Sequence, residues 1–193
     1  MSECRLEIPL DAEKIGKLVV GDFVYLSGIV YTGRDKAHQR MLEVKETPFQ
    51  LRGGVIFHCG PLVRKIGGGY EVLGAGPTTS SRMNSFTPAV LGKYGVKAVV
   101  GKGGMSREVV ESMRRNKVVY LAMTGGCAVS ASDAIKKVGG VFWEDLGLPE
   151  AVWKLYVMDF GPLIVAIDAH GNSLYEDVRV EVERNLKRVL TEL

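Results

Sequence analysis

Glycine-rich segments that also contain arginine, lysine, threonine or serine recur along the sequence, each between an apolar run and a predicted helix. They occupy residues 28–35, 76–83, 101–105 and 124–127. A loop that opens a helix leaves backbone N–H groups unpaired, and the helix dipole favours negative charge at the same place. In α/β sheets such loops gather at the carboxyl ends of the strands, so segments distant in sequence bind one ligand. The pattern indicates a composite anion-binding site.

Cationic side chains within these segments narrow the choice of anion. Arg34 and Arg82 present planar guanidinium groups that match a carboxylate or a phosphate, and Lys102 adds a compact charge. The sequence contains neither GxxxxGK(S/T) nor a complete GxGxxG followed by an acidic partner, so a nucleotide is disfavoured. A small dicarboxylate is the better candidate.

The same residues also have ordinary structural interpretations. Arg34 with Asp35 is a charged helix start, residues 78–81 are a capping cluster after Pro77, and Lys102 lies on a solvated glycine loop. The residue types alone leave both interpretations open.

The histidines and cysteines add less. His38 follows Arg34 by four residues, so it lies on the same face of the predicted helix, where it would orient a substrate or Asp35. His58 and His170 are interpreted as structural. Cys4, Cys59 and Cys127 are widely separated and form no CxxC pair, so no metal site is expected in this chain.

Hydrophobic periodicity predicts the elements that position these loops. The expected strands cover residues 5–8, 23–27, 54–58, 70–73, 96–100, 118–123, 153–158 and 163–168. The expected helices cover residues 34–45, 88–94, 106–116, 130–138 and 175–190. The strand–helix–strand order across 96–123 predicts a parallel pair, and no linker interrupts the chain. The fold class is therefore α/β, in a single compact domain with a β-rich opening.

Composition excludes several classes of protein. The 193 residues are 46% hydrophobic and 24% charged, which is typical of a globular protein. A net charge of +3, with cations spread along the chain, gives no reason to expect nucleic-acid binding. No apolar run reaches the roughly 18 residues that a membrane helix needs, and the N-terminus lacks a signal-peptide pattern. We expect a cytoplasmic protein that binds no membrane.

Long motifs in register give the sequence a family resemblance. Residues 27–38, 76–83 and 101–105 resemble, in order and spacing, the β subunit of class I fumarase and of L(+)-tartrate dehydratase. The match runs from about residue 5 to about residue 185. It implies a swivelling β/β/α domain over residues 1–193, with a mixed sheet flanked by helices. It also implies a separate α subunit that holds a [4Fe-4S] cluster, with none bound by this chain alone.

The resemblance also implies roles for individual residues. Thr78 and Lys102 match catalytic positions, although an alcohol is a weak base at neutral pH, so Thr78 would need activation by a charged neighbour. The positions that match substrate binding, some of them supporting, are Arg34, Asp35, His38, Thr79, Arg82 and Gly103. Clamps of this kind orient a substrate and oppose the charge that develops during reaction.

The expected function is therefore reversible hydration of fumarate to (S)-malate by a heterodimer or larger assembly. Dehydration of L(+)-tartrate is the first alternative, because one added hydroxyl changes few contacts. A dicarboxylate-binding module without catalytic activity is the second. A cationic site that lacks its own metal, acid–base pair or nucleophile is only part of an active site, so a partner subunit is expected on physical grounds too.

Overall fold

The structure is a computed structural model that describes residues 2–191. Its main feature is a seven-stranded mixed sheet in the order β1-β2-β3-β6-β7-β9-β8, with a separate β4-β5 hairpin. The strands are β1 (Glu3–Glu7), β2 (Phe23–Thr32), β3 (Val55–Phe57), β4 (Leu62–Ile66), β5 (Gly69–Gly74), β6 (Ala98–Gly101), β7 (Val119–Ala122), β8 (Ile135–Phe142) and β9 (Val152–Ile167). This confirms the predicted α/β class with a mixed sheet.

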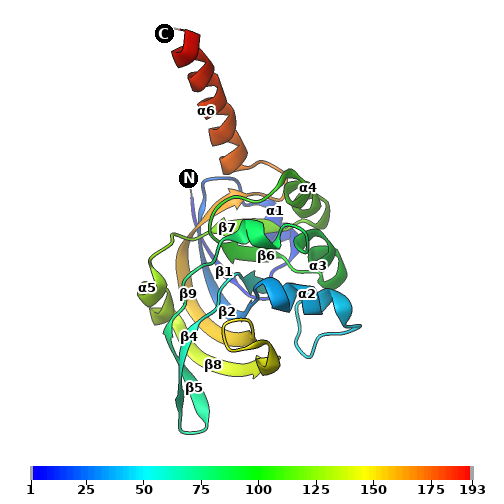
Figure 1. The fold of residues 1–193 in the computed structure, drawn as a ribbon, viewed down its shortest axis with the longest axis vertical. Coiled ribbons are helices and arrows are strands. Elements are labelled where there is room, and N and C mark those ends of the chain that lie inside the picture. The colour runs from blue at the N-terminus through cyan, green and yellow to red at the C-terminus, as the bar shows by residue number, and fades with distance from the viewer. Residues whose placement is uncertain (1, 192–193) are drawn as a thin grey trace.

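Strand β9 closes the sheet on itself. The last residues of β9 pair antiparallel with β7, most of its length pairs antiparallel with β2, and its first residues also pair antiparallel with β8. Strands β2, β3, β6 and β7 are parallel neighbours, so the extra β2–β9 pairing completes a ring. Figure 1 shows β9 curving around this ring. The two strands predicted at 153–158 and 163–168 are this one long strand.

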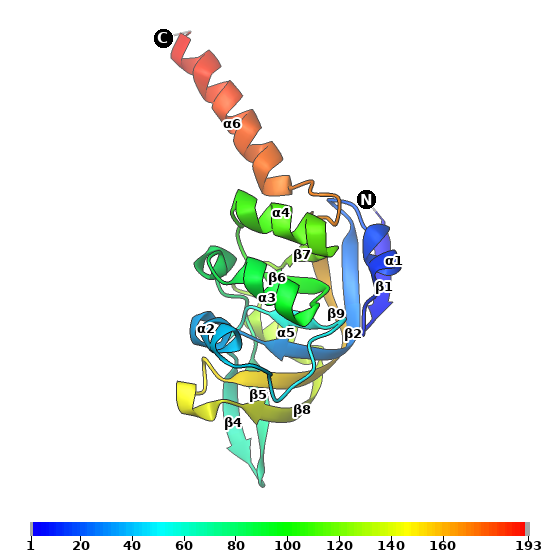
Figure 2. The same ribbon diagram turned by 90° about the vertical axis from the view of Figure 1, so that its right-hand side faces the viewer.

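Helices cover the ring unevenly. The α-helices are α1 (Ala12–Gly16), α2 (Asp35–Glu43), α3 (Thr87–Tyr94), α4 (Arg107–Asn116), α5 (Ala128–Asp133) and α6 (Leu174–Thr191), with short 3-10 turns η1 (Ser80–Met83) and η2 (Glu144–Leu146). Helices α2, α3 and α4 lie together on one side, and α1 lies beside β1 on the other (Figure 2). The predicted domain also includes residues 1, 192 and 193, which lie outside the described residues.

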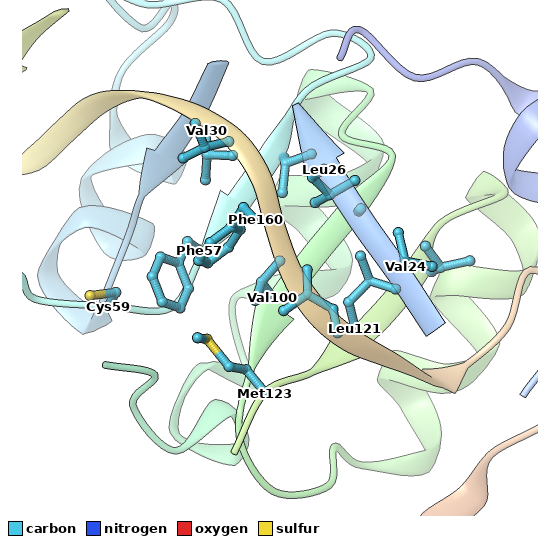
Figure 3. Packing of buried hydrophobic residues seen from close by; sticks show 14 of the residues in the cluster. Val24, Leu26, Val30, Phe57, Cys59, Val100, Leu121, Met123 and Phe160 are labelled. Atoms are coloured by element: carbon cyan, nitrogen blue, oxygen red, sulfur yellow. The ribbon is translucent and has the colours of Figure 1, made fainter. Parts of the chain in front are cut away.

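Two apolar clusters hold these layers together. The first fills the interior of the ring, where Val24, Phe57, Val100 and Phe160 pack among neighbouring strands (Figure 3). The second lies between the strands and helices α2, α3 and α4. Because alternate residues of a strand face opposite sides, β3 and β6 contribute to both clusters. This packing fixes the strand ends from which the glycine-rich loops emerge.

Two predictions about local structure are wrong. The helix predicted over 130–138 ends at Asp133, and β8 begins at Ile135, because pairing with β9 outweighs the local preference of this lysine- and glycine-containing segment. The loop predicted over 28–35 is a strand as far as Thr32, since β2 continues alongside β3 and β9. The sequence patterns also do not predict α1 or β4.

Helix α6 confirms the closing helix predicted at 175–190, but it projects away from the body of the molecule (Figures 1 and 2). None of its residues is buried. Within residues 2–191, no helix is both long enough and apolar enough to cross a membrane.

Candidate active site

The predicted anion-binding loops follow parallel strands. Strands β2, β3, β6 and β7 run in the same direction, so their carboxyl ends lie at one edge of the ring. Arg34 follows β2, His58 follows β3, Lys102 follows β6 and Thr124 follows β7. The strand directions thus bring segments from across the sequence to one edge, as the loop pattern predicted.

The loop at 76–83 crosses this edge and is attached to it through the backbone. The N–H of Thr78 donates to the carbonyl of His58 at 2.7 Å, and the N–H of Lys102 donates to the carbonyl of Thr78 at 3.2 Å. The N–H of Ser80 then donates to the carbonyl of Lys102 at 2.9 Å. Thr79 pairs with Lys102 as an isolated parallel bridge. Thr78, Thr79 and Lys102 are therefore held side by side.

Arg34 occupies the N-cap position of α2 and lies partly buried. Its Nε is 3.2 Å from Oε1 of Glu150, an ion pair that lies outside hydrogen-bonding alignment. Gly60 makes room for this side chain, because a Cβ there would lie 2.7 Å from a guanidinium nitrogen of Arg34. The side chain is 22% exposed, so it is anchored while part of it still reaches the surface.

Arg82 and Asp35 form a two-point ion pair across 47 residues of sequence. Nε and one terminal nitrogen of Arg82 donate to the two carboxylate oxygens of Asp35, at 3.2 and 2.6 Å. This contact joins η1 to the start of α2. The Arg82 side chain is 48% exposed, and its other terminal nitrogen is not used by Asp35, so the guanidinium is oriented while keeping a donor for a ligand.

His38 is buried, so it does not lie at the surface where the sequence suggested it would orient a substrate. Its Nδ1 is 2.9 Å from the carbonyl of Arg34, to which it donates, and its ring meets that of His58 edge to face at 5.1 Å. Burial lowers the pKa of both histidines, and that of His58 falls well below its ordinary value. Both are therefore neutral at neutral pH. His38 fixes the backbone that holds Arg34.

Sequence reasoning missed a buried polar network beneath the loops. Nδ1 of His58 lies 2.8 Å from Oγ of Ser80, and that hydroxyl lies 2.9 Å from the hydroxyl of Tyr120. The Tyr120 hydroxyl also donates to the carbonyl of Gly103 at 2.9 Å. The available signal was a polar or aromatic residue just after or within an apolar strand, a pattern that equally suits a core residue.

Lys102 lies between this network and the loop that follows β7. A Cβ placed on Gly125 would meet the Lys102 side chain at 3.5 Å, so the lysine chain passes over that glycine. Gly103, next to it, has φ of +75°, a left-handed conformation in which a side chain would be strained. Gly125 therefore leaves space for the Lys102 side chain, and Gly103 allows the backbone to turn beside it.

The cysteines of this chain do not suit a metal cluster. Among residues 2–191, no group of three or more His, Cys, Asp or Glu side chains is arranged to hold a metal ion. Burial raises the pKa of the Cys59 thiol to about 12, which opposes the thiolate form that a cluster requires. Sγ of Cys127 instead donates to the carbonyl of Thr124 at 2.6 Å. The residues that the structure describes therefore offer no ligand set for an iron–sulfur cluster.

Comparison with known proteins places this architecture in a family. The family described as fumarase C-terminus matches residues 1–178. The "L(+)-tartrate dehydratase subunit beta" of Escherichia coli strain K12 is 44% identical, over 93% of this chain and 90% of that protein. The "Putative L(+)-tartrate dehydratase subunit beta" of Methanocaldococcus jannaschii is 42% identical, over 94% and 95%.

A longer relative matches only in part. The "Putative fumarate hydratase class I" of Geobacillus stearothermophilus is 42% identical, over 90% of this chain but 34% of its own length. Arg34 and the loops at 76–83 and 101–105 lie at one edge of an α/β domain. In the relatives, the matching sequence is either a separate subunit or one part of a longer chain. This chain belongs to the fumarase C-terminus family, which includes subunits of hydro-lyases.

Proposed function

We propose that this chain is the β subunit of a two-subunit iron–sulfur hydro-lyase that interconverts fumarate and (S)-malate. One observation carries the proposal: the carboxyl ends of β2, β3 and β6 meet at an edge that the loop at 76–83 crosses. Arg34, Arg82 and Lys102 stand on these segments. Cations gathered there suit a small diacid with charge at both ends.

The cations divide the work of binding and stabilisation. Arg34 and Arg82 bind substrate carboxylates, and Glu150 and Asp35 hold their guanidinium groups in place. Such preorganisation lowers the entropy lost when the substrate is oriented. Lys102 contacts a carboxylate and opposes the negative charge that grows when the adjacent carbon loses its proton.

Thr78 is the residue of this chain that we assign to proton transfer. It is partly exposed, and its backbone is fixed between His58 and Lys102. An ordinary alcohol is too weak a base for this role, so a charged group must activate it. Among the described residues its hydroxyl makes no hydrogen bond, so we assign the activating group to the partner. Thr79 and Gly103 complete the binding surface beside it.

The other half of the site belongs to an α subunit. We assign the [4Fe-4S] cluster to that subunit, because the cysteines here do not form a ligand set. Relatives of nearly the same length are named as β subunits, and the longer relative named as a fumarate hydratase matches over 34% of its length. Residues 1–193 would then act as one swivelling domain that closes on the α subunit.

Tartrate is the second candidate substrate, because the relatives in Escherichia coli and Methanocaldococcus jannaschii are named as tartrate dehydratase subunits. An added hydroxyl on the substrate changes only one or two contacts with the enzyme. We assign these contacts mainly to the α subunit. The edge described above contains no feature that selects between the two diacids.

Reconstitution tests the proposal. The chain is mixed with a cluster-bearing α subunit, and the absorbance of the fumarate double bond is followed with malate as substrate, while oxaloacetate is measured with tartrate. The larger kcat/KM identifies the substrate. A complex that forms but converts none of these hydroxy-diacids would contradict the proposal and leave a dicarboxylate-binding module as the better description.

A further inference from the structure

A hydrogen-bonded chain of side chains runs beneath the proposed substrate loops and ends beside Lys102. His58, Ser80 and Tyr120 are all buried, with contacts of 2.8 Å between His58 and Ser80 and 2.9 Å between Ser80 and Tyr120. A further 2.9 Å contact joins Tyr120 to the carbonyl of Gly103. The chain thus links β3, the loop at 76–83, β7 and the loop that follows β6.

The chemistry of the end groups fixes the direction of the chain. The carbonyl of Gly103 only accepts, so the single proton of the Tyr120 hydroxyl goes to it. The Ser80 hydroxyl must then donate to the Tyr120 oxygen, which leaves the Ser80 oxygen to accept from His58. His58 is therefore protonated on Nδ1.

The opposite end of His58 supports the same tautomer. Its Nε2 is buried and has no hydrogen-bond partner among the described residues. A buried N–H left without an acceptor is less tolerable than a bare lone pair, because the orphaned donor loses its hydration entirely. Protonation on Nδ1 leaves the lone pair on Nε2, which is the cheaper arrangement.

The backbone of the loop is shaped to admit this chain. A Cβ on Gly101 would lie 1.9 Å from Oγ of Ser80 and 3.2 Å from the hydroxyl of Tyr120. Glycine at 101 therefore lets the Ser80 hydroxyl sit directly against the end of β6. The backbone contacts described above hold Lys102 through its own N–H and carbonyl. The next carbonyl along the loop, that of Gly103, is held by Tyr120.

We propose that His58, Ser80 and Tyr120 are positioning residues that fix the Gly103–Gly104 peptide, and through the Gly103 backbone the Lys102 side chain, for the diacid. The catalytic consequence of this inference rests on the proposed function. The geometry of the hydrogen-bonded side chains does not. Ser80 has a central place, because its own loop also contains Thr78 and Arg82, so one hydroxyl couples that loop to the lysine.

Two measurements on the full chain alone test the geometry. Nitrogen-15 chemical shifts of the His58 ring should report a proton on Nδ1 and none on Nε2. In Tyr120→Phe, exchange of the Lys102 amide hydrogen should become faster by about tenfold, the factor for losing one hydrogen bond. A proton on Nε2, or unchanged exchange at Lys102, would overturn the inference whether or not the complex is an enzyme.

Kinetics of the reconstituted complex test the consequence. Tyr120→Phe should lower kcat/KM for the diacid by about 10- to 100-fold, as expected for a displaced catalytic group. Tyr31→Phe is the matched control, because Tyr31 is also buried on a strand, and its ring packs on Phe49 while its hydroxyl makes no hydrogen bond among the described residues. Equal kinetic losses in the two variants would overturn the positioning role.

Substitutions at His58 provide a rescue test. The amide nitrogen of asparagine occupies nearly the place of Nδ1, whereas that of glutamine occupies the place of Nε2. His58→Asn should therefore retain more activity and slower Lys102 exchange than His58→Gln, although both remove the ring. If His58→Gln performs better, the donor is on the other nitrogen and the inference fails. A wild-type complex that is silent with every diacid would refute the proposed function only.

Discussion

Replacing Gly101 with alanine should strongly destabilise the protein, because the new methyl group would occupy the place of the Ser80 hydroxyl. The Cβ would lie 1.9 Å from Oγ of Ser80, and carbon and oxygen atoms that are not bonded need more than about 3 Å. The serine must therefore retreat by more than about 1 Å. Its contacts to His58 and Tyr120, at 2.8 and 2.9 Å, would then exceed hydrogen-bonding distance.

The cost follows from those two lost contacts. Each buried polar group left unsatisfied costs about 1 to 3 kcal/mol, so the free energy of unfolding of Gly101→Ala should fall by about 2 to 6 kcal/mol. Gly92→Ala is the matched control. Gly92 lies inside α3, and a Cβ there would meet nothing within 4 Å. The same methyl should raise stability there by about 0.5 to 1 kcal/mol, since alanine favours a helix interior.

Urea denaturation of the chain, followed by circular dichroism, measures both values. We expect Gly101→Ala to lower the free energy of unfolding and Gly92→Ala to raise it. A loss below about 1 kcal/mol for Gly101→Ala would refute the reasoning, because it would show that the Ser80 hydroxyl is free to move. Similar effects at both positions would also refute it.

Other expected outcomes concern pH, reactivity and local stability. Because burial lowers the pKa of His38 and His58 in the folded state, the unfolded chain binds more protons than the folded one below about pH 6.5. The free energy of unfolding, measured by urea titration, should therefore rise from about pH 5 to 7 and then level off. A flat profile would contradict this expectation. Burial raises the pKa of the Cys59 thiol to about 12, so mass spectrometry after alkylation of the native protein should find Cys4 and Cys127 modified first. Early modification of Cys59 would show that the structure around this thiol opens to solvent. In the isolated chain, backbone amides of α6 should exchange much faster than those of α4, because an 18-residue helix with no buried residue is marginal. Equal protection of the two helices would contradict this expectation.

The sequence was sufficient to locate the candidate site, because its signal is local. A strand followed by glycine and a cation, then a helix, predicts where a backbone leaves the sheet, and parallel strands bring such exits to one edge. Arg34, Arg82 and Lys102 are therefore recognisable as candidates from the sequence alone, and the structure puts Arg34 and Lys102 just beyond β2 and β6.

Contacts between distant segments could not be predicted in this way. The pairing of Arg82 with Asp35 spans 47 residues, and no periodicity encodes it. The closure of the ring by β9 depends on its pairing with β2 and β7 together. No local pattern encodes these pairings, so the sequence does not show that the two predicted strands are one long strand.

The burial of individual polar and aromatic side chains could not be predicted from the sequence either. His38 lies on the predicted helix, but it is buried and its ring meets that of His58. Tyr120 stands in the middle of an apolar strand, where an aromatic residue is ordinarily part of the core. Only the positions of Ser80 and Gly103 reveal that its hydroxyl has a partner on each side.

The central claim is that Lys102 contacts the diacid during its conversion. It is tested most directly by steady-state kinetics of the α–β complex in which Lys102→Ala is compared with Lys137→Ala, an exposed lysine on β8. Loss of a preorganised charge contact should lower kcat by about 100-fold or more in the first variant and leave the second near wild type. Full turnover by Lys102→Ala would contradict the account.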